Sequence, residues 1–163
     1  MSSIKINIGL VFGGSSNEHE VSILSAKSIY KALSHSSNYK YFKVHPFYID
    51  KNGYWRDNEY SKSILSEDKS QDLTLNRIKD KINNLSRLPK EFDKIDIWFP
   101  VLHGPNGEDG AIQGLFKLTG KPFVGSGVLG SSLGMDKIAM KSIFKSFNLP
   151  QTPYIYLNKE DIF

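Results

Sequence analysis

The segment His103–Gly114, HGPNGEDGAIQG, places side chains capable of acid–base chemistry in a glycine-rich turn. It combines one imidazole with the adjacent carboxylates of Glu108 and Asp109 and with four glycines. A hydrophobic run from Ile95 to Leu102 precedes it, and apolar residues at helical spacing follow it. A turn from a strand into a helix presents free backbone N–H groups and the positive end of a helix dipole. Ligands bind at this edge of open α/β sheets, so the segment predicts a ligand site.

Each polar residue of this segment also has a structural interpretation. A single histidine at a strand end is often a core residue, but the glycine after His103 and the nearby carboxylates favour a site role. Glu108 and Asp109 are interpreted as residues that shape and charge the start of the following helix. They are too close in sequence to be assigned as an acid and base pair without geometry. Gly107 and Gly110 are expected to shape the turn.

The first glycine loop, GGSSNEHEVS over 13–22, carries acids and lacks the third glycine of a dinucleotide fingerprint. Glu18 and Glu20 would repel a phosphate, so phosphate binding is excluded for this loop. A carboxylate beside glycines suits a cationic group, such as the amine of an amino acid. Taken alone, Glu18 equally well marks the start of a helix.

Lysines spaced four apart, at Lys137, Lys141 and Lys145, would share one face of a helix. We interpret this row as a solvated face, because no nucleic-acid recognition motif accompanies it, and we expect no nucleic-acid partner. Lys137 follows the small, flexible stretch 125–134 and is a candidate phosphate contact. No Walker, HExxH or EF-hand spacing is present, so no metal site is predicted.

These residues are positioned by strands that alternate with helices, which predicts an α/β three-layer sandwich with a mainly parallel sheet. The pattern predicts strands over 4–12, 41–49, 95–102 and 121–125, and helices over 21–33, 75–88 and 112–118. Asn17 or Ser16 is expected to cap the first helix. The turn at 50–53 predicts a hairpin or a strand extension, and 151–157 is a further strand or a linker. A last helix ends at Leu149–Pro150, and its apolar stripe is predicted to be core; its members are Met140, Ile143, Phe144 and Phe147.

The composition limits the class of protein. The chain of 163 residues suits one domain with a short extension, and 39% hydrophobic and 12% aromatic residues exclude a disordered chain. The absence of cysteine excludes disulfides and thiolate metal sites. No apolar run approaches the roughly 20 residues of a spanning helix, and the N-terminus is unlike a signal peptide. We therefore expect a cytoplasmic protein without a membrane partner.

Three segments together resemble the D-alanine–D-alanine ligase family of ATP-grasp enzymes. They are FGGSSNEHEVSILSAKSI over 12–29, the long motif over 103–137, and KSIFKSFNLP over 141–150. The resemblance implies a Rossmann-like, pre-ATP-grasp domain over 1–150 and the start of a linker over 151–163. The family phosphorylates the carboxylate of one D-alanine with ATP, and the amine of a second D-alanine attacks the acyl phosphate, which supplies peptidoglycan synthesis.

The resemblance also implies residue roles. Glu18 is similar to the family's acid that holds the ammonium of the first D-alanine, and we expect it to be the catalytic residue. His103 is similar to the histidine that lines the same pocket. Val21 is expected beside the substrate methyl group, and Lys137 is similar to a lysine that reaches nucleotide phosphates.

The family's ATP-grasp domain, with its nucleotide and magnesium ligands, has no counterpart in these segments. We therefore expect the isolated chain to be inactive and to bind neither ATP nor Mg²⁺ strongly, although the complete enzyme uses both. The expected partners are D-alanine, ATP and a second copy in a homodimer, with exposed apolar surface near 150–163. The alternatives are a stand-alone α/β binding or dimerisation module and a flavodoxin-like nucleotide binder.

Overall fold

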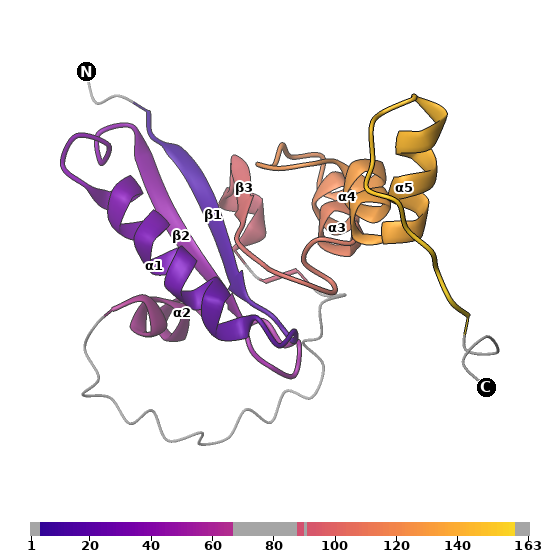
Figure 1. Ribbon diagram of the computed structural model, residues 1–163. Helices are drawn as coiled ribbons and strands as arrows, with labels where there is room; N and C mark the ends of the chain where they lie inside the picture. Colours follow the sequence, from indigo (N-terminus) through magenta and orange to yellow (C-terminus); the bar gives the residue numbers. More distant parts are fainter. Residues whose placement is uncertain (1–3, 67–87, 90, 159–163) are drawn as a thin grey trace.

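A three-stranded parallel sheet, in the order β2–β1–β3, organises the chain (Figure 1). The structure is a computed structural model that describes residues 4–66, 88–89 and 91–158. The strands are β1 (Ile6–Gly13), β2 (Phe42–Ile49) and β3 (Ile97–Pro100). The helices are α1 (His19–Ser34), α2 (Asn58–Leu65), α3 (Ala111–Leu118), α4 (Val128–Met135) and α5 (Lys137–Ser146), and a short 3-10 helix, η1 (Phe92–Lys94), precedes β3.

Both faces of the sheet are covered, as the predicted three-layer α/β arrangement requires. Leu10 and Phe12 of β1 belong to the apolar cluster beside α1 and α2. Val11 points the other way, into the cluster that includes residues of α3. There Trp98 of β3 stacks on Phe116 of α3, with ring centroids 4.9 Å apart. Figure 1 shows α1 and α2 on one side of the strands and α3 on the other.

Most of the predicted elements are present with shifted ends. The strands predicted over 4–12 and 41–49 and the helices over 21–33 and 112–118 are β1, β2, α1 and α3. The strand predicted over 95–102 is shorter, since only residues 97–100 pair with β1. The predicted hairpin at 50–53 is confirmed by an antiparallel bridge between Ile49 and Trp55.

The prediction of a fourth strand over 121–125 is wrong. Phe123 forms only an isolated parallel bridge with Trp98, whose N–H donates to the Pro122 carbonyl at 3.0 Å. Proline has no N–H to extend the ladder. Gly125, at φ 123°, then turns the chain away from the sheet.

The small residues predicted as a flexible stretch instead form α4. Glycine and serine are poor helix formers in isolation, but tertiary contacts override propensity here. The Ser132 hydroxyl donates to the Asp109 carbonyl at 2.7 Å, which joins α4 to the loop before α3. Short side chains let α4 approach the loop that precedes α3.

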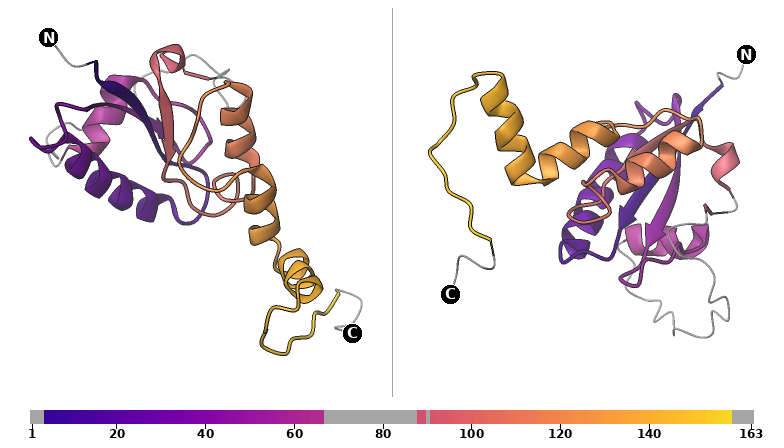
Figure 2. Two further views of the ribbon diagram at one scale, coloured as in Figure 1. Left: turned by 90° about the horizontal axis from the view of Figure 1, so that it is seen from above. Right: turned by 90° about the vertical axis from the view of Figure 1, so that its right-hand side faces the viewer.

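The apolar stripe of α5 is not core, contrary to prediction. No residue of α5 is buried, and Ile143, Phe144 and Phe147 are exposed. Helical periodicity identifies which side chains share a face, whereas burial needs a second element against that face. Figure 2 shows α5 projecting away from the sheet, and within the described ranges the stripe is only partly covered.

The remaining expectations concern the variable region and the C-terminal segment. The predicted helix over 75–88 lies almost wholly outside the described residues. Residues 151–157 have no regular secondary structure, and Leu149, Ile155 and Leu157 are exposed, as expected for this region. Within the described ranges, no helix has the length and apolar character needed to cross a membrane.

A chain of polar side chains ties the three strands together at the end where they begin. The Asn7 N–H and Nδ2 donate to Asp96 Oδ2 at 2.7 and 2.9 Å, and His45 Nε2 lies 3.0 Å from Asn7 Oδ1. Because both Asn7 groups favour its ionised form, the pKa of Asp96 is lowered. Asn7 Oδ1 can only accept, so the His45 Nε2 carries the proton.

We predict that His45 makes the fold less stable as the pH falls below neutral. Burial lowers the pKa of His45, Lys43, Lys62 and Lys94 lower it further, and Glu91 partly opposes them. The unfolded histidine, with a pKa of about 6.5, takes up a proton that the folded one does not, so stability falls as pH drops through that value. Urea unfolding at about pH 7.5 and pH 5 measures this loss.

The His45→Gln variant isolates this contribution. Glutamine keeps a donor toward Asn7 but does not titrate, so the loss of unfolding free energy between the two pH values becomes smaller. His35→Gln, at an exposed position, is the control and leaves the loss unchanged. An equal loss in wild type and His45→Gln would contradict the prediction, since Asp96 acts only below about pH 4.

Candidate functional site

The loops that follow β1 and β3 lie at the same edge of the sheet, because parallel strands end there together. Beside the loop after β3 is a cleft of about 490 Å³. Its walls include His103 and Glu108 from this loop, Gln113 from α3, Ser131 from α4, and Lys137 from the start of α5. The cleft therefore joins two of the predicted site residues, His103 and Lys137.

The acidic pair of the loop is bound to the loop's own backbone. Glu108 Oε2 accepts the Gly104 N–H at 2.8 Å. Asp109 accepts the N–H groups of Asn106, at 2.8 Å, and Ala111, at 3.0 Å. These contacts confirm the interpretation that Glu108 and Asp109 shape the turn into α3.

His103 is half-buried at the end of the β3 segment. Its Nε2 atom is buried and has no hydrogen-bond partner in the described part of the chain. A satisfied core histidine would have such a partner. The geometry therefore favours the site interpretation of His103.

Glu18 is the N-cap residue of α1, so the predicted capping by Asn17 or Ser16 is wrong. The Ser16 hydroxyl accepts the N–H of Glu18 at 3.2 Å, and this N–H belongs to the N-cap residue and not to the first turn of α1. The Glu18 carboxylate is exposed and lies against the loop after β3. A methyl group placed on Gly104 would be 3.1 Å from Glu18 Oε2. The structure thus places Glu18 beside the residue that follows His103.

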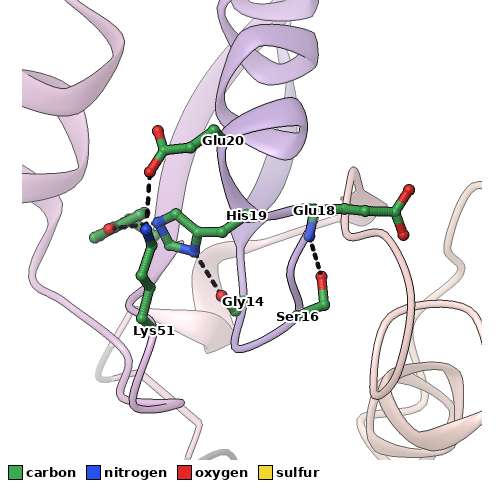
Figure 3. A network of polar contacts seen from close by, with 7 residues as sticks. Gly14, Ser16, Glu18, His19, Glu20 and Lys51 are labelled. Carbon is green, nitrogen blue, oxygen red and sulfur yellow. Dashed lines mark hydrogen bonds and ion pairs between the residues drawn. The ribbon is translucent and has the colours of Figure 1, made fainter.

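The two acids that flank His19 point to opposite sides of the start of α1 (Figure 3). Glu20 pairs with Lys51, with Nζ 3.1 Å from Oε1. The Glu18 carboxylate points away from this pair, and no ion pair involving it occurs among the described residues. Of the two acids, Glu18 is the one available to a ligand cation.

His19 fixes the start of α1 to the sheet, a role that the sequence analysis missed. Its Nδ1 lies 2.5 Å from the Gly14 carbonyl, which only accepts, so Nδ1 carries a proton. In the neutral ring, Nε2 then accepts from the Tyr48 hydroxyl at 2.9 Å. Burial, followed by the effects of Tyr60 and Asp50, raises the pKa of Tyr48 to about 12, so this hydroxyl keeps its proton at neutral pH.

Ser22 is a second buried anchor, one turn further along α1. Its hydroxyl donates to the Val101 carbonyl at 2.5 Å and accepts the Gly13 N–H at 2.8 Å. It therefore connects α1 to the last residue of β1 and to Val101, the residue that follows β3. The sequence signal was a polar residue three positions after His19, on the face that α1 buries with Ala26.

Ser22→Ala is expected to lower the free energy of unfolding by about 3 kcal/mol, because it leaves a buried N–H and a buried carbonyl unsatisfied. Urea unfolding of the chain measures the change. Ser28→Ala, at an exposed position of the same helix, is the control and should change stability by less than about 0.5 kcal/mol. Equal effects of the two substitutions would show that Ser22 is not an anchor.

The other predicted site residues, Val21 and Lys137, are not brought together with Glu18. Val21 is half-exposed on α1, and neither Val21 nor Glu18 is among the described residues that line the cleft. Lys137 is exposed and donates from Nζ to the Gly134 carbonyl at 2.9 Å. Lys141 lies over the Tyr154 ring, 4.6 Å from its centroid. The lysine row is therefore part of α5, and its first member faces the cleft.

Comparisons with known proteins agree on one family. The family model described as D-ala D-ala ligase N-terminus matches residues 7–126. A D-alanine–D-alanine ligase from Prochlorococcus marinus (strain NATL1A) is 64% identical over 162 residues, which are 99% of this chain and 45% of that protein. The ligase of strain NATL2A is 63% identical over the same shares of the two chains.

The structural comparison gives the same result. The solved structure of the D-alanine–D-alanine ligase from Coxiella burnetii matches with a TM-score of 0.69 at 29% identity, over 91% of this chain and 43% of that one. The chain thus spans about half the length of the curated relatives it matches. These relatives do not favour the alternative of a stand-alone binding module.

Proposed function

The chain belongs to the D-alanine–D-alanine ligase family and corresponds to the N-terminal part of its members. On this premise we propose that it supplies the first D-alanine subsite of an ATP-dependent ligase. The proposed reaction joins two D-alanines for peptidoglycan synthesis in the cytoplasm. Residues 1–150 would form the substrate-binding domain and 151–163 the start of a linker. We also propose that the protein forms a homodimer, because apolar residues are exposed on α5 and in the segment that follows α5.

One observation carries the proposal. The Glu18 carboxylate lies against Gly104, at the sheet edge where ligands bind, and makes no ion pair within the described ranges. An exposed carboxylate without an ion-pair partner among the described residues suits the ammonium group of an amino acid. His103 directly precedes Gly104 in the chain, and Val21, one turn along α1, would border the substrate methyl group.

Lys137 is the proposed contact for nucleotide phosphate, because this cationic residue lines the same cleft as His103. When bound, ATP would supply the phosphoryl group that activates the D-alanine carboxylate. No group of three or more histidine or acidic side chains gathers in the described part of the chain as a Mg²⁺ site. No described residue is therefore assigned to the ion.

A chimera tests the proposed function. This chain replaces the matching 162 residues of the NATL1A ligase, which is similar enough for its remaining part to dock. We expect the chimera to form D-alanyl-D-alanine and release phosphate with ATP, whereas the isolated chain releases none above background. A folded chimera that forms no dipeptide, beside an active parent enzyme, would overturn the proposal.

A further inference from the structure

We propose that Gln113 is a positioning residue for substrate binding, acting through the loop that carries His103. The inference rests on the proposed function, since it concerns the same D-alanine subsite. Gln113 lies in the first turn of α3 and is 6% exposed. It also borders the cleft that His103 and Lys137 line.

The Gln113 amide holds the middle of the loop. Its Nε2 donates to the Gly107 carbonyl at 2.8 Å in a buried hydrogen bond. Gly107 is pressed against the sheet at the same point, because a methyl group placed on it would lie 2.7 Å from Leu102 Cβ. The loop is therefore fixed between the end of the β3 segment and the Gln113 side chain.

The held carbonyl is coupled to the residues beside the proposed subsite. The Gly107 N–H donates to the Gly104 carbonyl at 3.0 Å, and the Glu108 N–H donates to the same carbonyl at 2.9 Å. Gly104 in turn follows His103 and lies beside the Glu18 carboxylate, since a methyl group placed on Gly104 would be 3.1 Å from Glu18 Oε2. A shift of Gly107 would move both the backbone beside Glu18 and the imidazole of His103.

The choice of glutamine is not explained by packing alone. Its Oε1 is buried and has no hydrogen-bond partner among the described residues, which costs free energy in a folded chain. A methionine of similar volume would avoid that cost. The Nε2 donor toward Gly107 is the feature of Gln113 that an apolar side chain cannot replace.

The test compares Gln113→Met with Gln113→Glu in the chimera. Methionine keeps the volume without a donor, so the KM for D-alanine should rise about tenfold while the KM for ATP changes by less than about twofold. The glutamate variant carries a carboxylate that repels the Gly107 carbonyl at neutral pH. Its activity relative to wild type should recover as the pH falls, because a protonated carboxyl can donate.

A purely structural role would give a different pattern. Equal rises in the two KM values, or a Gln113→Glu variant without pH-dependent recovery, would overturn the proposal. A wild-type KM for D-alanine in Gln113→Met would also overturn it.

Amide hydrogen exchange in the isolated chain separates this proposal from the proposed function. In Gln113→Met the amides of Gly107 and Glu108 should exchange about tenfold faster, because the loop loses one buried hydrogen bond. The amide of Ser22 in α1 is the internal control and should keep its rate. If the chimera is inactive but these loop amides exchange faster, the function is wrong and the positioning of the loop by Gln113 stands. Unchanged loop exchange would refute the positioning role.

Discussion

Replacing Glu18 by glutamine in the chimera is expected to lower kcat/KM for D-alanine about a hundredfold, because the substrate ammonium loses its counter-charge. Glutamine preserves the shape of the side chain and its place against Gly104. The loss therefore reports charge and not packing. Steady-state kinetics at varied D-alanine concentration measure it.

Glu20→Gln is the matched control. It removes the same charge two residues away, but Glu20 faces Lys51 on the other side of α1 (Figure 3). An exposed pair of this kind contributes about 0–1 kcal/mol, so kcat/KM should stay within about twofold of wild type. If both variants lose activity equally, the loss comes from a general change in the protein's charge, and the proposed ammonium contact with Glu18 is wrong.

Gly13→Ala is expected to lower the free energy of unfolding by about 4 kcal/mol or to prevent folding, from strain and overpacking together. Gly13 ends β1 at φ 93°, a conformation that side chains disfavour. A methyl group there would collide with the Ile49 carbonyl oxygen and lie 2.8 Å from Tyr48 Cε2. The backbone oxygen cannot move without breaking the pairing of β1 with β2.

Gly53→Ala separates the two contributions. Gly53 also has a positive φ, 82°, but a methyl group there meets nothing within 4 Å. Alanine at this position should cost about 1 kcal/mol, from backbone strain alone. Thermal and urea unfolding of both variants measure the difference, and equal costs would mean that the collision at Gly13 is relieved by a small shift.

The parts of the fold that sequence predicts are those with a strong local pattern. β1 and β2 are largely apolar and end at glycines or a turn, so their type and approximate limits follow from the burial of their second halves. α4 could not be predicted, because its serines and glycines form a helix only where tertiary hydrogen bonds compensate for poor propensity. The stripe of α5 shows the converse limit, since periodicity does not say what covers a face.

The site follows the same division. The loop motifs predicted Glu18, His103 and Lys137, and the structure brings His103 and Lys137 to one cleft and Glu18 to the loop beside it. Without the family resemblance, residue type alone does not separate Glu18 from Glu20, because only the direction of each side chain distinguishes them. His19 and Ser22 were missed because their partners are backbone carbonyls that lie apart in the chain.

The backbone-bound carboxylates of the His103–Gly114 segment have an electrostatic consequence. Glu108 and Asp109 keep their negative charge, but hydrogen bonds from loop N–H groups hold both carboxylates against the loop's own backbone. The loop then separates an anionic side, at Glu18, from a cationic side, at Lys137. A zwitterion that binds across it has one favourable direction, with its ammonium toward α1 and its carboxylate toward α5. The field of the protein would thus orient a bound zwitterion before any side-chain specificity acts.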